Sequence, residues 1–366
     1  MLDRLQRART RVSDLDAQIQ RLEVSIAILR AERLVLQEPL DSYTYPVLTL
    51  PTEITCEIFL HFLPPYPACP PITGPFSPTI LTHVCRTWRD IADATPYLWS
   101  RITLSAQELS LDTQIEISDL WIRRSRSRAL AIDLQNNQDQ NLMGLKSLIA
   151  HRLRWERLTL RIPTSTADVP RTDGPMPLLR YLDINSLFHE DSTPLTFLDA
   201  PLLRAVVFNY KAAAMIPVPW AQLTSLTLYY IFPHECVPIL AQGLNLVHCE
   251  LRFVFSPEET DVVLNFTLPR LQTLILQDMY HECPSGLLTS FVVPALRTLQ
   301  IPAWFFGSTP LDDLRAWILK VGCKLQKVHI IGELETSDEA LRREFPTIGD
   351  LSVRQYADTD WNPFTY

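Results

Sequence analysis

The apolar positions of the first 38 residues recur with the seven-residue period of a coiled coil. The first position of the heptad holds Leu5, Val12, Ile19 and Ile26, and the second, three residues further on, holds Ala8, Leu15, Leu22, Leu29 and Leu36. The pattern stops before Pro39, because proline interrupts helical hydrogen bonding. A coiled-coil helix is therefore predicted over residues 1–38, followed by a linker over residues 39–46.

The residue types at the two apolar heptad positions also favour a parallel two-stranded assembly. β-Branched residues at the first position with leucine at the second are typical of two parallel strands, so one prediction is a parallel homodimer through residues 5–36. The alternative is a single helix whose apolar stripe packs onto the rest of the same chain.

From Val47 to Leu104 the apolar spacing changes to that of short amphipathic helices. Pro51 can stand in a first helical turn, and Leu50, Ile54, Ile58 and Phe59 follow helical spacing around it. A second helix is predicted to be capped by Ser77 and begun by Pro78, with a stripe formed by Ile80, Leu81, Val84, Cys85, Trp88 and Ile91. An aromatic segment with Leu98 and Trp99 closes the region.

Residues 64–76 separate these two helices and contain six prolines among thirteen residues. Such a composition predicts an exposed extended loop. Its PPYP sequence is either part of a spacer or a ligand for an aromatic groove.

The order LP-x-E-I, I-F, V-C-x-x-W-x-x-I-A and P-x-LW resembles the F-box, and more closely the F-box-like variant of fungal proteins. The resemblance covers residues 47–100 and implies docking onto the Skp adaptor of a cullin–RING ubiquitin ligase. The residues that it assigns to adaptor binding are Leu50, Pro51, Ile54, Ile58, Phe59, Val84, Trp88 and Trp99. The alternative is that the same stripe is only the core of a helical hairpin.

Beyond Leu104 a pattern L-x-x-L-x-L recurs. Its fourth positions are Leu158, Leu182, Val206, Leu226, Cys249, Leu274, Leu299 and Val328. Their spacing of about 20–29 residues is that of leucine-rich repeats, in which each repeat supplies one strand and a return segment. The predicted fold class is therefore an N-terminal coiled coil and helical F-box-like domain followed by an α/β leucine-rich-repeat solenoid over residues 101–356, with a tail at 357–366. The segment WSRITL fits the strand pattern, which predicts that the F-box-like helices run directly into the first strand.

The residues between the leucines of each strand are predicted to face the concave side of the solenoid. Those assigned to a protein substrate are Arg180, Tyr181, Asp183, Arg204, His248, Glu250, Arg297 and Lys327. Arginine and tyrosine often carry interface energy, and the alternative is a solvated face without a ligand.

Composition narrows the function further. A formal charge of −8 argues against nucleic acid, and the chain has no apolar run of the roughly twenty residues that a membrane span needs. Seven cysteines without a C-x-x-C pair favour a reducing compartment, cytoplasmic or nuclear. No catalytic motif occurs, so neither enzymatic activity nor a cofactor is expected; two HEC segments, at 234–236 and 281–283, are the only hint of a metal site.

These patterns predict the substrate-recognition subunit of an SCF-type ubiquitin ligase, which binds the Skp adaptor through the F-box and an unidentified protein substrate through the repeats. The first alternative is a non-catalytic coiled-coil and leucine-rich-repeat scaffold outside any ligase. The second is an enzyme whose site has no recognisable motif.

Overall fold

The computed structural model describes residues 2–43, 45–105, 109–135, 141–162, 173–186, 195–255, 265–278, 287–306, 309–332 and 338–354. The predicted tail at 357–366 lies outside these residues. Internal contacts divide the chain into two compact units, Met1–Ile58 and Phe59–Tyr366. The second unit thus contains most of the predicted F-box-like region together with the predicted solenoid.

The first unit consists mainly of one long helix, α1 (Leu2–Ser42), in which no residue is buried. The prediction that this helix ends before Pro39 is wrong, because the proline lies inside it. A proline deletes one backbone hydrogen bond, but the Tyr43 amide still donates to the Leu40 carbonyl at 3.3 Å, and side chains also bridge the last turn. Gln37 Nε2 donates to Asp41 Oδ1 at 2.7 Å, and Ser42 Oγ donates to the Pro39 carbonyl at 3.1 Å. A short 3₁₀ turn, η1 (Pro46–Thr49), then leads to helix α2 (Thr52–Phe62), which begins in this unit.

The helical part of the second unit comprises η2 (Pro78–Ile80), α3 (Leu81–Val84), α4 (Arg86–Asp93) and η3 (Pro96–Trp99). The predicted cap is confirmed, since Ser77 Oγ accepts a hydrogen bond from the Thr79 amide at 3.3 Å. The prediction of one continuous helix is wrong, because Cys85 adopts an extended backbone with φ −157° and ψ 171°. Its Sγ accepts from the Trp88 amide at 3.4 Å and so begins a new helix.

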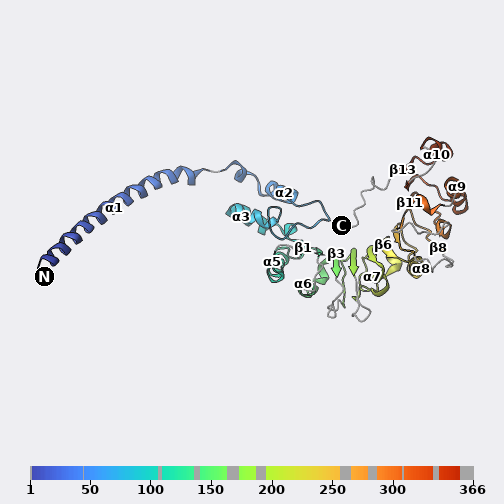
Figure 1. The fold of residues 1–366 in the computed structure, drawn as a ribbon, viewed down its shortest axis with the longest axis horizontal. Coiled ribbons are helices and arrows are strands. Elements are labelled where there is room, and N and C mark those ends of the chain that lie inside the picture. The colour runs from blue at the N-terminus through green and yellow to red at the C-terminus, as the bar shows by residue number, and fades with distance from the viewer. Residues whose placement is uncertain are drawn as a thin grey trace. The chain divides into compact units, whose positions relative to one another are not determined.

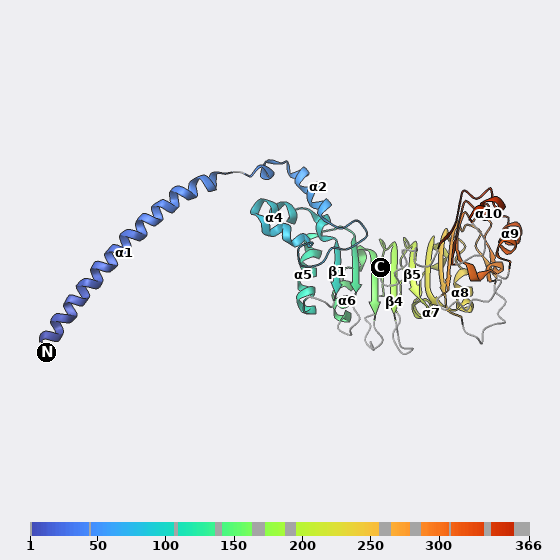
Figure 2. The same ribbon diagram turned by 45° about the horizontal axis from the view of Figure 1, so that its top comes forward.

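The rest of the second unit is built on an 11-stranded parallel sheet whose strands follow chain order (Figure 1). These strands are β1 (Arg101–Ser105), β2 (Leu130–Gln135), β3 (Trp155–Ile162), β4 (Tyr181–Ser186), β5 (Ala205–Asn209), β6 (Ser225–Ile231), β7 (His248–Phe253), β9 (Thr273–Asp278), β11 (Thr298–Pro302), β12 (Lys327–Ile331) and β13 (Asp350–Arg354). In this unit the strands line the inner side of an arc, and Figure 2 shows them side by side.

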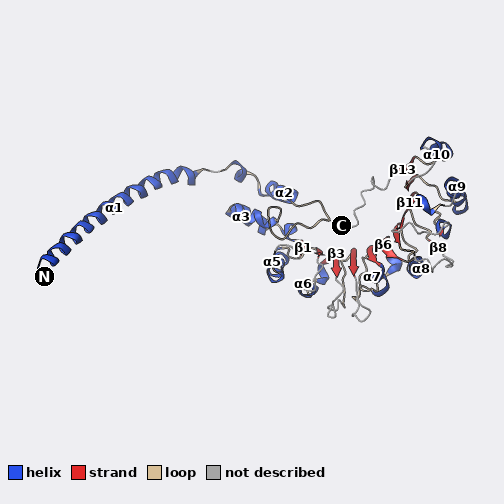
Figure 3. Ribbon diagram, in the orientation of Figure 1, coloured by secondary structure: helices blue, strands red, loops and turns tan. Residues whose placement is uncertain are grey.

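Helices and short turns return the chain between strands on the outer side of this arc (Figure 3). They are α5 (Leu111–Arg124), α6 (Asn141–Ile149), η4 (Arg152–Arg154), α7 (Tyr210–Met215), η5 (Trp220–Gln222), α8 (Pro233–Leu240), η6 (Leu287–Ser290), η7 (Ala303–Phe305), α9 (Pro310–Val321) and α10 (Asp338–Glu344). Two short strands, β8 (Phe266–Thr267) and β10 (Phe291–Val292), pair with each other. A strand followed by a return segment, repeated along one sheet, is an α/β solenoid-like architecture.

The register of the sheet confirms the predicted alignment of the repeats. The fourth-position residues lie opposite one another from strand to strand, from Leu158↔Leu182 through Cys249↔Leu274 to Leu299↔Val328. All eight are at most 1% exposed. Burial of one apolar row under the return segments therefore holds the strands in register.

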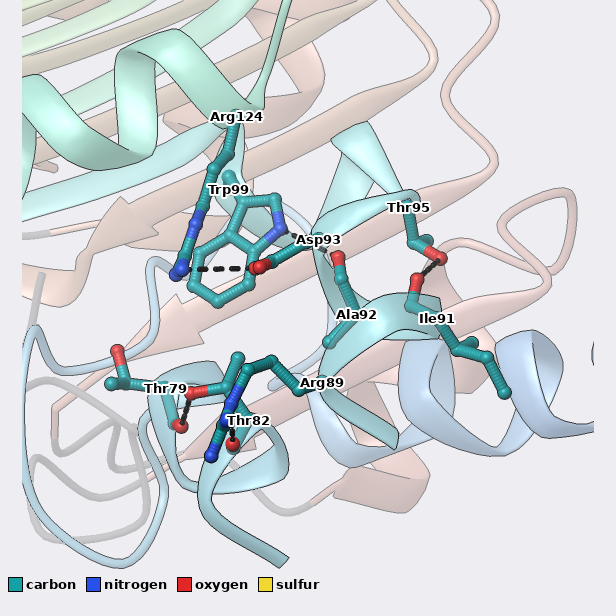
Figure 4. A network of polar contacts seen from close by, with 9 residues as sticks. All are labelled: Thr79, Thr82, Arg89, Ile91, Ala92, Asp93, Thr95, Trp99 and Arg124. Atoms are coloured by element: carbon teal, nitrogen blue, oxygen red, sulfur yellow. Dashed lines mark hydrogen bonds and ion pairs between the residues drawn. The ribbon is translucent and has the colours of Figure 1, made fainter. Parts of the chain in front are cut away.

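The predicted junction between the helices and the first strand is also present, and Trp99 lies at its centre (Figure 4). Its indole Nε1 donates to the Ala92 carbonyl at 2.8 Å, and its ring meets Trp121 of α5 edge-on at 5.5 Å. The Arg124 guanidinium lies 4.5 Å from the Trp99 ring and pairs with Asp93 at 2.9 Å. Helix α4, η3 and the first return helix consequently share one core.

Candidate functional site

The adaptor-binding residues assigned by resemblance fall into exposed and buried groups. Leu50, Ile54 and Ile58 are 39%, 49% and 48% exposed, and Val84 on α3 is 58% exposed. Ile54 and Ile58 are one turn apart on α2 and so share a face of that helix. Pro51 is exposed and its carbonyl accepts from the Thr55 amide at 3.1 Å, which starts the helix.

Two of these assignments are corrected by the structure. Phe59 is 1% exposed and Trp99 is fully buried, so both side chains belong to the chain's own core and are not available to an adaptor. Trp88 is half-buried and meets Phe59 edge-on with ring centroids 5.0 Å apart. The apolar pattern of α2 therefore consists of two neighbouring stripes, one facing the core through Phe59 and one exposed through Ile54 and Ile58.

The second candidate surface is the inner face of the sheet, on which every other strand residue points away from the core. The strand register arranges these residues in three rows that cross the strands. The first row runs through Arg101, Ala131, Arg157, Tyr181, Ala205, Ser225, His248, Thr273, Thr298, Lys327 and Asp350. The second includes Asp133, Asp183, Thr227 and Glu250, and the third includes Gln135, Arg161, Asn209, Tyr229 and Arg252.

The structure places five of the eight predicted substrate-binding residues on these rows. They are Tyr181, His248 and Lys327 in the first row and Asp183 and Glu250 in the second. Asp183 is only 5% exposed and its carboxylate is bound by Arg161, so its assignment to a substrate is corrected.

The remaining three, Arg180, Arg204 and Arg297, are corrections, because each lies one residue before its strand. Their backbones form the edge of the ladder, as in the bond from the Arg204 amide to the Arg180 carbonyl at 3.0 Å. The Arg204 guanidinium turns back to its own loop and donates to the Pro201 and Leu203 carbonyls. The L-x-x-L-x-L motif begins before the strand itself, so the prediction assigned residues that precede the strand to its inner face.

The third row was missed because the L-x-x-L-x-L template ends one residue too early. Continuing the alternation by one position would have found it. Asn209 in this row donates from Nδ2 to Asn185 Oδ1 at 3.2 Å, and its own Oδ1 caps α7 by accepting from the Ala212 amide at 3.1 Å.

Two arginines of the third row form ion pairs with predicted carboxylates of the second. Arg161 binds Asp183 through both guanidinium nitrogens, at 2.7 and 3.0 Å. Burial alone would lower the pKa of Arg161, but the hydrogen bond and charge of Asp183 outweigh it and raise that pKa. Arg252 binds Glu250 at 2.7 Å and stacks over Tyr229 at 4.4 Å. The middle of the face thus presents fixed, internally neutralised charges.

Asp133 lies on the same face, and its charged carboxylate is disfavoured in the folded state because it is partly buried. Burial raises the pKa of its carboxyl and the charge of Asp183 adds to this, whereas Gln135 and Arg161 act in the opposite direction. A raised carboxyl pKa in the folded state means that stability is lost as the pH rises through that pKa. Asp133→Asn is therefore expected to raise the melting temperature at pH 7 by about a few degrees, with the gain vanishing below about pH 4.

Thermal unfolding monitored by circular dichroism across this pH range measures the effect. Glu116→Gln on α5 is the matched control, because that carboxyl is exposed and should leave the melting temperature nearly unchanged. A lower melting temperature for Asp133→Asn at pH 7 would contradict the assignment.

The hints of other chemistry gain no support from the described residues. They contain no group of three His, Cys, Asp or Glu side chains that could hold a metal ion, and no helix among them is long and apolar enough to cross a bilayer. Cys236 of the first HEC segment is buried, and burial raises the pKa of its thiol well above the usual value. The second HEC segment lies outside the described part of the chain.

The candidate surfaces are thus an exposed aliphatic stripe on α2 and a polar inner face on the sheet. In comparisons with known proteins, no family model matches the chain and no curated protein sequence matches it significantly.

Proposed function

We propose that this chain is the substrate-recognition subunit of an SCF-type cullin–RING ubiquitin ligase. It binds the Skp adaptor through Leu50, Pro51, Ile54 and Ile58, and it holds a protein substrate on the inner face of the sheet. The observation that carries the proposal is the exposed aliphatic stripe of α2, on a helix whose other stripe is in the core.

Exposed aliphatic side chains grouped on one helix face are a typical sign of a protein interface. Covering an isoleucine side chain completely contributes roughly 1.5–3 kcal/mol. The resemblance of LP-x-E-I and its flanking residues to the F-box supports the Skp adaptor as the occupant of this stripe.

The substrate end of the proposal depends on the three rows. Tyr181 supplies an aromatic group of the kind that often carries interface energy, and the Glu250–Arg252 pair on the same face is held in a fixed geometry. Their geometry is fixed by ion pairs and stacking, which limits the entropy lost on binding a ligand. In this role the polypeptide positions a substrate and needs no catalytic residue of its own.

Titration of the purified full chain with purified Skp adaptor tests the docking directly, and a one-to-one complex is expected. Leu50→Ala combined with Pro51→Ala should weaken it about tenfold, since one exposed leucine side chain contributes about 1–2 kcal/mol. A folded chain that fails to bind the adaptor at micromolar concentration would leave the scaffold function as the better description.

We also propose that α1 forms a parallel homodimer through residues 5–36. The supporting observation is that its heptad residues are exposed, from 40% at Leu15 to 63% at Leu22. Most helical stability in proteins comes from packing an apolar face, and a second copy of the same seam would cover this one. This dimer is compatible with either the ligase or the scaffold function.

A further inference from the structure

The proline-rich segment Pro64–Phe76, called the strap below, contains neither a helix nor a strand, as its composition predicted. It is not the wholly exposed loop that was expected, because Pro70 and Ile72 are buried. The Ile72 carbonyl accepts from Ser77 Oγ at 3.0 Å, which ties the end of the strap to the cap of η2. Both ends of the strap are therefore fixed within the second unit.

The strongest anchor of the strap is Arg101, the first residue of β1. Its Nη1 donates to the carbonyls of Pro64 at 2.8 Å and Ala68 at 2.9 Å. Arg101 is only 4% exposed, so its charge has little contact with water. Moving the strap away would remove both of these carbonyl partners from a buried cation, which is costly.

Two further contacts carry the strap across the next strands. Cys69 Sγ lies 3.9 Å from the Ala131 carbonyl on β2, and burial raises the pKa of this thiol to about 12. The ring of Tyr66 lies 5.7 Å from the guanidinium of Arg157 on β3, which itself stacks on Tyr181 of β4 at 3.7 Å. The strap thus touches the first-row residue of β1, β2 and β3 in succession.

The register supplies an internal comparison. Ala131 on β2 and Ala205 on β5 occupy the same row, yet Ala131 is 4% exposed whereas Ala205 is half-buried. The strap contacts Ala131, and its described contacts end at Arg157 on β3, before the strand that carries Ala205.

We propose that the strap is a built-in cover for the first row of the inner face on β1–β3, which directs a protein ligand to the strands from β4 onward. That a protein ligand binds there rests on the proposed function, whereas the covering of these strands by the strap is independent of it. The surface left to a ligand then begins at Tyr181 on β4 and includes His248 on β7 and Lys327 on β12.

Cysteine labelling of the full chain tests the cover without any ligand. Ala131→Cys and Ala205→Cys place the same thiol in one row, under the strap and beyond it. We expect N-ethylmaleimide to modify position 131 at least about tenfold more slowly than position 205, because each tenfold corresponds to about 1.4 kcal/mol of local opening. Peptide-resolved mass spectrometry separates these sites from the native cysteines.

Loosening the anchors should raise the rate at position 131 alone. Arg101→Ala and, separately, Tyr66→Ala should each increase it severalfold while position 205 is unchanged. Arg101→Lys should give an intermediate rate, because its ammonium keeps a charged donor but lacks the guanidinium geometry. If Ala131→Cys disturbs folding, the native Cys69 thiol provides the same readout in the wild-type chain. Equal rates at 131 and 205, or a Cys69 that reacts as fast as position 205, would overturn the proposal.

The outcome is independent of the ligase assignment. Failure of adaptor binding would leave the labelling rates as they are, and rapid labelling under the strap would leave the adaptor stripe on α2 unaffected.

Discussion

Replacing both Ile54 and Ile58 with aspartate is expected to abolish binding of the Skp adaptor. The two side chains are 49% and 48% exposed, so the free chain should tolerate the change. In the complex, each substitution would remove apolar contact worth roughly 1.5–3 kcal/mol and place a carboxylate in a dry interface. The dissociation constant should therefore rise by at least about a hundredfold, as measured by isothermal titration calorimetry with purified adaptor.

The matched control is Leu319→Asp. Leu319 is an even more exposed aliphatic residue, at 76%, on helix α9. Leu319→Asp also replaces an exposed aliphatic side chain with a carboxylate, but on a helix that the proposal does not use. The affinity for the adaptor should therefore remain at the wild-type value. An unchanged affinity for the Ile54/Ile58 double variant, with an unchanged melting temperature, would show that the adaptor docks elsewhere or not at all.

The apolar spacing was sufficient to predict the parallel strands and their register. Residues such as Leu182 and Leu274 recur once per repeat and are fully buried, so one physical requirement determines both the pattern and the fold. The same spacing was insufficient for α2, where neighbouring stripes both look apolar in sequence. Only the packing shows that Phe59 faces the core and that Ile58 remains exposed.

Features that depend on individual polar contacts could not be predicted from the apolar spacing of the sequence. The break at Cys85 depends on a thiol that caps the Trp88 amide, and cysteine is not among the usual capping residues. The strap has no periodicity of its own, and its anchor Arg101 is 37 residues from Pro64 and 33 from Ala68. Such long-range contacts leave no local signal, whereas the third row of the inner face required only that the alternation be continued by one residue.

The proposed parallel dimer of α1 predicts a large change in the mass of the particle in solution when the seam is disrupted. The full chain has a mass of 42.0 kDa, and light scattering is expected to give about twice that value. Replacing both Ile19 and Ile26 with aspartate should return it to the monomer mass. Both residues occupy the first heptad position, where each would bring like charges together across a parallel two-stranded seam.

Val24 and Ile28 lie on the same helix outside the seam and are 57% and 62% exposed. Their double replacement with aspartate makes the same change in charge and apolarity as the Ile19/Ile26 variant, and it should leave the dimer mass unchanged because these positions do not face the partner. The contrast between the two pairs isolates the seam from any general loss of helix stability. A monomeric wild-type chain, or equal masses for the two double variants, would contradict the coiled-coil dimer. The alternative, a single helix whose apolar stripe packs onto the rest of the same chain, would then be favoured.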